Sequence, residues 1–155
     1  MQNNYEAPDY CFVAVGDGTV VSSICKGFME FLKLGLVDKI PKIIGVQAEG
    51  ASTVKKVYEN GKPYLPISEI VNTIADSICV GNPRDVIKAS IFMDMVKGEF
   101  ISVSDEEIIS SIVDLASKTG IFTEPAGAAT LAGLNKMIKH GRIGCLLYTS
   151  PSPRD

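Results

Sequence analysis

Three short, mostly apolar runs stand out along the chain, and a glycine or a polar turn follows each of them. They cover residues 10–15 (YCFVAV), 42–48 (KIIGVQA) and 99–103 (EFISV). Short runs that are apolar on both faces are typical of strands buried in a parallel sheet. The pattern therefore predicts three buried strands, and we expect a fourth, short one at residues 77–80.

Between these runs, apolar residues recur at the three- and four-residue spacing of amphipathic helices. The predicted helices cover residues 19–34, 50–58, 82–97, 104–120 and 125–140. Pro83 is placed at the first helical position of the third helix. Ser104 and Glu107 form a capping box that starts the fourth helix, and Gly120 ends it. Residues 62–77 contain prolines and are predicted to form a long irregular loop.

The alternation of strands and helices implies right-handed βαβ units and a mainly parallel sheet with helices on both faces. We therefore predict an α/β protein with a three-layer sandwich architecture. A length of 155 residues suits one domain, and 46% apolar residues are enough for a core. No internal repeat is visible.

The composition excludes several classes of function. The net charge is −3 and the Lys and Arg residues are scattered, which leaves no basic patch for DNA or RNA. No apolar run approaches the ~20 residues that cross a bilayer, and no secretory signal is visible. The cysteines form no C-x-x-C pair, and a single histidine argues against a zinc site. Free, apolar-flanked cysteines predict a cytoplasmic protein.

Residues 145–155 (CLLYTSPSPRD) differ from the rest of the chain in composition. The two Ser-Pro pairs are incompatible with a helix or a central strand. One interpretation is a flexible C-terminal tail. The residues also match the peptide encoded by one reading frame of a common transposase-type sequencing adapter, and we favour this interpretation. We therefore expect residues 1–144 to be native and the tail to be non-native.

The strongest candidate for chemistry is the glycine turn at residues 15–20 (VGDGTV), where a buried strand ends and a helix begins. Such a turn presents backbone N–H groups and the positive end of a helix dipole to an anion. Thr19 and Ser22 add hydroxyl donors, and Asp17 is expected to point away. The G-x-G-x-x-G and Walker patterns are absent. The residues alone are therefore compatible with a phosphate site or with a turn that binds nothing.

The remaining candidates have simpler interpretations. Arg84 and Asp85 stand at the start of a predicted helix and are interpreted as a local charge pair. Cys25 and Cys79 are interpreted as small buried side chains. His140 lies beside a glycine helix stop, where its partial charge suits the helix dipole.

Four segments, in order along the chain, carry a resemblance to a known family. They are residues 15–52, 73–85 (TIADSICVGNPRD), 103–108 (VSDEEI) and 120–129 (GIFTEPAGAA). Together they resemble threonine synthase, a pyridoxal-phosphate enzyme of fold type II, over roughly residues 6–144. The last segment alone is shared with threonine dehydratases and related lyases. The resemblance implies an incomplete tryptophan synthase β-like domain.

The resemblance also implies a cofactor, pyridoxal 5'-phosphate, and the residues that hold it. In the family, the loop that matches this turn cradles the phosphate of the cofactor, which assigns binding to Gly16, Asp17, Gly18, Thr19 and Val20. Many relatives have Gly and Asn in place of Thr19 and Val20, so an Asn side-chain contact is lost here while main-chain donors remain. Glu124 either lies near the cofactor face or only caps a helix dipole.

Family chemistry requires two groups that do not occur in this chain. One is the Schiff-base Lys of an S-F-K-D-type motif in the N-terminal half, and the other is the Thr of a T-G-x-G-L-K-type segment that meets the pyridine nitrogen. No catalytic residue is therefore assigned. We expect residues 1–144 to be a partial cofactor-binding large domain, inactive alone, with Met1 internal to a longer protein.

The complete enzyme implied by the resemblance converts O-phosphohomoserine and water to threonine and phosphate, through β,γ-elimination and replacement. Its substrate is a small molecule, with no nucleic-acid or membrane partner, and a homo-oligomer is compatible with it. Two alternatives stay open. One is another fold type II enzyme, such as cysteate synthase or threonine dehydratase. The other is a non-catalytic module that binds a phosphate ligand, which the DNA upstream of Met1 would distinguish.

Overall fold

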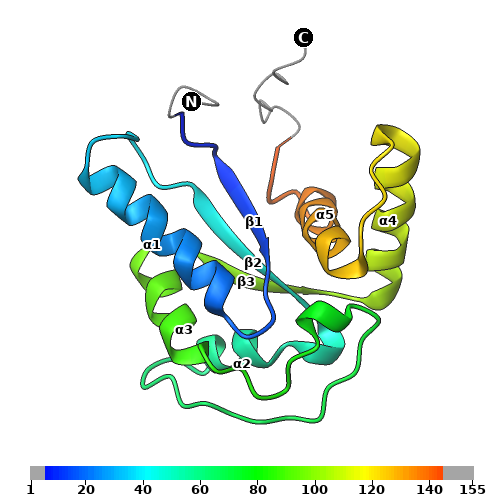
Figure 1. Cartoon of the computed structure of the whole chain (residues 1–155), viewed down its shortest axis with the longest axis horizontal. Coiled ribbons are helices and arrows are strands. Elements are labelled where there is room, and N and C mark those ends of the chain that lie inside the picture. The colour runs from blue at the N-terminus through cyan, green and yellow to red at the C-terminus, as the bar shows by residue number, and fades with distance from the viewer. Residues whose placement is uncertain (1–5, 145–155) are drawn as a thin grey trace.

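A sheet of three parallel strands forms the centre of the computed structural model, which describes residues 6–144. The spatial order is β1-β2-β3, so β2 is central and pairs with both neighbours (Figure 1). Ile44 of β2, for example, is in register with Phe12 on one side and Glu99 on the other. The strands are β1 (Tyr10–Ala14), β2 (Lys42–Ala48) and β3 (Glu99–Val103). The expected non-native tail at 145–155 lies outside the described residues.

Helices cover both faces of the sheet, which confirms the predicted three-layer α/β architecture (Figure 1). Helices α1, α2 and α3 pack on one face, whereas α5 lies on the other face with α4 packed against it. Two 3₁₀ turns, η2 and η3, interrupt the loops. The helical elements are α1 (Thr19–Lys33), η2 (Glu49–Ala51), α2 (Thr53–Glu59), η3 (Asp76–Ile78), α3 (Val86–Met95), α4 (Asp105–Thr119) and α5 (Pro125–Lys139).

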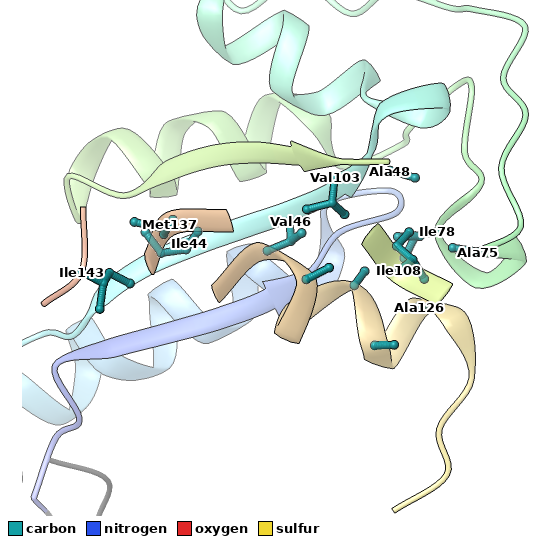
Figure 2. Close-up of a cluster of buried hydrophobic side chains, with 13 residues drawn as sticks. Ile44, Val46, Ala48, Ala75, Ile78, Val103, Ile108, Ala126, Met137 and Ile143 are labelled. Atoms are coloured by element: carbon teal, nitrogen blue, oxygen red, sulfur yellow. The ribbon is translucent and has the colours of Figure 1, made fainter. Parts of the chain in front are cut away.

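The central strand is buried on both faces because successive side chains point to opposite layers. Ile43 packs with the cluster under α1 and α3, and its neighbour Ile44 packs with the cluster under α5. Figure 2 shows Ile44, Val46 and Val103 in the second cluster, together with residues of α5. This two-sided burial explains why the strand segments are apolar at successive positions.

Two local predictions are wrong, and the glycine turn explains both. Residues 77–80 form no strand: η3 and the residues after it pack against Gly16, where a Cβ would lie 3.2 Å from the Ser77 carbonyl oxygen. The third helix begins at Val86 rather than at residue 82. The Asp85 N–H donates to the Asp17 carbonyl oxygen at 3.1 Å, so the preceding residues belong to a turn that docks on the loop.

The buried-cysteine prediction holds for one residue of two. Cys25 is fully buried between α1 and α3, with its Sγ 3.7 Å from Met93 Sδ, and burial raises the pKa of its thiol to about 11. Cys79 is only partly buried.

The capping box of α4 is confirmed at the start of the helix, and Gly120 ends it with φ +72°. The Glu107 N–H donates to Ser104 Oγ at 3.2 Å, while Glu107 Oε2 accepts the Ser104 N–H at 2.8 Å. Two helix-terminal N–H groups are thereby satisfied. Lys136 of α5 also donates to Glu107 Oε2 at 3.1 Å, which ties the cap to the neighbouring helix.

Replacing the capping hydroxyl tests this contact. We expect Ser104→Ala to lower the free energy of unfolding by about 1 kcal/mol, since one N–H at the helix start loses its acceptor. Urea denaturation followed by circular dichroism measures the change. Ser110→Ala, on the exposed surface of the same helix, is the matched control and should leave stability within about 0.5 kcal/mol. Equal losses in both variants would show that the cap contributes nothing.

Candidate active site

The glycine turn lies at the carboxyl end of β1 and leads directly into α1 (Figure 1). Gly18 is the N-cap of α1 and has φ +97°, a conformation that side chains other than glycine rarely adopt. A Cβ at Gly18 would also lie 2.8 Å from the Ala89 Cβ of α3. The turn therefore requires glycine for its backbone conformation and for its close approach to a neighbouring helix.

The hydroxyl groups of Thr19 and Ser22 and one backbone N–H of the turn are already engaged within the protein. The Thr19 N–H donates to Asp17 Oδ1 at 2.9 Å, and the Thr19 hydroxyl donates to Asp85 Oδ2 at 2.5 Å. The Ser22 hydroxyl donates to the Thr19 carbonyl oxygen at 2.9 Å. The expectation that Thr19 and Ser22 offer hydroxyl donors to an anion is therefore wrong for this arrangement. The Asp17 carboxylate stays at the helix N-terminus rather than pointing away from it.

Two backbone donors of the turn have no acceptor among the described residues. Over residues 6–144, no acceptor is present for the N–H groups of Gly18 and Val20. Both belong to the first turn of a helix of 15 residues, where the dipole adds positive potential. Val20 is 60% exposed. Two unpaired donors and a helix N-terminus together can hold an anion through main-chain contacts.

A cavity of about 600 Å³ lies beside the turn. Residues of the strand end and the turn line it, including Gly16, Asp17 and Val20. Ser77 of η3 and Arg84 of the turn before α3 line it as well. The volume lies within the range of small-molecule sites.

The predicted local pair of Arg84 and Asp85 is wrong. Asp85 accepts from the Thr19 hydroxyl and from Lys88 Nζ at 2.9 Å, and these two contacts lower the pKa of the Asp85 carboxyl. Within the described part of the chain, Arg84 forms no ion pair. Among the described residues, it is also the only Lys or Arg that lines the cavity.

Glu124 is the N-cap of α5, but its side chain makes no capping hydrogen bond. Its Oε2 instead accepts from the Ser77 hydroxyl at 3.0 Å. Because Ser77 lines the cavity, this contact connects Glu124 to the site through one hydrogen bond. No local sequence signal singles out Ser77, although the residue falls within the TIADSI segment that carries the resemblance.

Neither a metal centre nor a membrane-spanning helix is found over residues 6–144. No group of three His, Cys, Asp or Glu residues there is arranged to hold a metal ion. No helix in the same range has the length and hydropathy of a membrane span.

The sequence matches a family described as pyridoxal-phosphate dependent enzyme over residues 1–145. It is 40% identical over 143 residues to the threonine synthase of Methanosarcina acetivorans, covering 92% of this chain and 35% of that protein. Threonine synthase from Mycobacterium tuberculosis is 37% identical over 140 residues, covering 88% and 36%. The chain thus spans about a third of the length of these relatives.

Solved structures of pyridoxal-phosphate enzymes share the fold. Threonine deaminase isoform 2 from Solanum lycopersicum superposes with a TM-score of 0.67 at 21% identity, covering 92% of this chain and 38% of that one. L-Serine ammonia-lyase from Rhizomucor miehei gives 0.68 at 20% identity, covering 94% and 42%. The expected fold type II architecture is therefore confirmed, as is the resemblance to threonine synthase. The chain belongs to the family of pyridoxal-phosphate-dependent enzymes.

Proposed function

We propose that the protein to which this chain belongs is a threonine synthase, which converts O-phosphohomoserine and water to threonine and phosphate in the cytoplasm. The name is shared by relatives from archaea and bacteria at 34–40% identity. Residues 1–144 are proposed to be part of its cofactor-binding large domain. The observation that carries the proposal is the glycine turn, which leaves two backbone donors free beside a cavity.

The residues of the turn fit the phosphate of pyridoxal 5'-phosphate. A Cβ at Gly16 or Gly18 would press on atoms of the neighbouring segments, so the two glycines let the walls of the cavity pack closely around the turn. A phosphate needs donors, which the Gly18 and Val20 N–H groups provide at a helix N-terminus. When bound, the cofactor supplies an electron sink for carbanion chemistry on an amino-acid substrate.

The individual residues of the turn have different roles in this proposal. Gly16 lets η3 pack closely against the turn, and Gly18 and Val20 donate main-chain hydrogen bonds. Thr19 acts indirectly, because its hydroxyl and its N–H hold Asp85 and Asp17 in place.

Glu124 and Ser77 are proposed to act as a unit at the cavity wall. The Ser77 hydroxyl donates to Glu124 Oε2, so Ser77 Oγ offers only its lone pairs to a bound molecule. This contact holds the Glu124 carboxylate at a fixed distance from the cavity. We assign Glu124 to positioning the cofactor side of the site rather than to capping α5 through hydrogen bonds.

Binding of the cofactor phosphate by the glycine turn is tested by introducing a negative charge at a position that tolerates it. An Asp at position 20 would lie in the first turn of α1, where a carboxylate interacts favourably with the helix dipole. We expect Val20→Asp to remain folded and to bind pyridoxal 5'-phosphate at least about 10-fold more weakly, a loss of about 1.4 kcal/mol. Absorbance titration of the bound cofactor measures the dissociation constant.

The matched control is Val20→Asn, which has nearly the same shape as the Asp variant without the charge and places an amide donor at the turn. It should bind pyridoxal 5'-phosphate at least as tightly as the unaltered chain. Pyridoxal, which lacks the phosphate, should bind equally to all three proteins. A Val20→Asp variant that retains full affinity for the phosphorylated cofactor would contradict the assignment. Gly18→Asp is less informative, because it also strains the backbone and collides with Ala89.

The reaction is tested in a chimera, since the chain spans about a third of its relatives. Residues 6–144 would replace the matching segment of the archaeal threonine synthase that is 40% identical. We expect this chimera to release phosphate from O-phosphohomoserine and to form threonine, at a rate within about 10-fold of the parent, because the grafted segment supplies an equivalent cofactor cradle.

Cofactor absorbance of the chimera serves as the control for folding. A chimera that binds pyridoxal 5'-phosphate but only converts threonine to a keto acid and ammonia would favour the threonine dehydratase alternative. One that binds the cofactor and acts on neither substrate would contradict the proposed reaction.

A further inference from the structure

Arg84 is held at the cavity by a backbone that is fixed on both sides. On the N-terminal side of Arg84, beyond Asn82 and Pro83, the Gly81 carbonyl oxygen accepts the Glu69 N–H at 2.9 Å. Asp85 follows Arg84, and the Asp85 N–H donates to the Asp17 carbonyl oxygen at 3.1 Å. The turn that carries the arginine is therefore docked directly on the glycine turn, whereas the side chain of Arg84 is exposed.

Among the described residues, the charges around this position leave the guanidinium group without a partner. The nearest acidic residue in sequence, Asp85, is engaged by Lys88 and Thr19. Asp17, which also lines the cavity, accepts the Thr19 N–H and forms no ion pair with Arg84 within the described residues. Within residues 6–144, Arg84 thus lines the cavity with its charge unneutralised by a carboxylate.

We propose that Arg84 binds a phosphate group in this cavity, as a cationic ligand that adds to the backbone donors of the glycine turn. A guanidinium group presents several N–H donors in one plane, which matches two oxygens of a phosphate. The proposal rests on the proposed function and extends it. That reaction involves two phosphates, one on the cofactor and one on the substrate, and Arg84 binds one of them.

The test compares phosphorylated ligands with their unphosphorylated counterparts. In the first arm, isothermal titration calorimetry measures binding of pyridoxal 5'-phosphate and of pyridoxal to the chain and to Arg84→Ala. In the second arm, O-phosphohomoserine and homoserine are titrated into protein saturated with the cofactor. We expect Arg84→Ala to lose about 10-fold in affinity for the phosphorylated member of one pair only, and Arg84→Lys to recover part of the loss.

Arg142→Ala is the matched control. Arg142 pairs with Glu99 at the start of β3, at the opposite end of the sheet from the cavity, so its loss removes the same charge elsewhere. It should leave all four affinities unchanged. Circular dichroism verifies that each variant is folded.

The outcomes separate this inference from the proposed function. A loss confined to pyridoxal 5'-phosphate assigns Arg84 to the cofactor, and a loss confined to O-phosphohomoserine assigns it to the substrate. If the unaltered chain prefers a phosphorylated ligand and Arg84→Ala keeps that preference, the role of Arg84 is overturned while the glycine turn stands. If the unaltered chain shows no preference in either pair, the proposed function fails, and this inference fails with it.

Discussion

The positive φ of Gly18 is the constraint on which the site depends. At φ +97° the chain turns sharply out of β1, so that α1 begins immediately beyond the strand end. The same glycine allows α3 to approach so closely that any Cβ would collide with Ala89. One residue therefore fixes both the helix N-terminus that can bind an anion and the packing of the helix beside it.

The turn and the start of α3 form a single hydrogen-bonded unit. Asp17 accepts from Asp85 through its carbonyl oxygen and from Thr19 through its carboxylate, while the Thr19 hydroxyl reaches Asp85. These contacts occupy the polar side chains that the motif displays, and they leave main-chain N–H groups for a ligand. Binding by backbone donors depends on the fold rather than on a given side chain.

The sheet could be predicted from the sequence because a strand buried on both faces has apolar residues at successive positions, such as Ile43 and Ile44. The capping box could be predicted because all of its groups lie within four residues. The wrong predictions arise from contacts between distant residues. Thr19 and Asp85 are 66 positions apart, and Ser77 and Glu124 are 47 apart. No pattern in the neighbouring sequence indicates that the Thr19 hydroxyl is bound by Asp85 or that Ser77 lines the cavity. Pro83 resembles a helix start because proline is common at the first helical position. The helix starts later because Asp85 is hydrogen-bonded to Asp17, and this contact between distant residues has no local signal either.

Amide chemical shifts report directly on whether the free N–H groups of this turn bind the cofactor phosphate. In a ¹⁵N–¹H correlation spectrum of the labelled chain, titration with pyridoxal 5'-phosphate should shift the Gly18 and Val20 amides most, and pyridoxal should shift them far less. If both amides stayed in place while saturating pyridoxal 5'-phosphate shifted resonances elsewhere in the chain, the turn would not be the phosphate site.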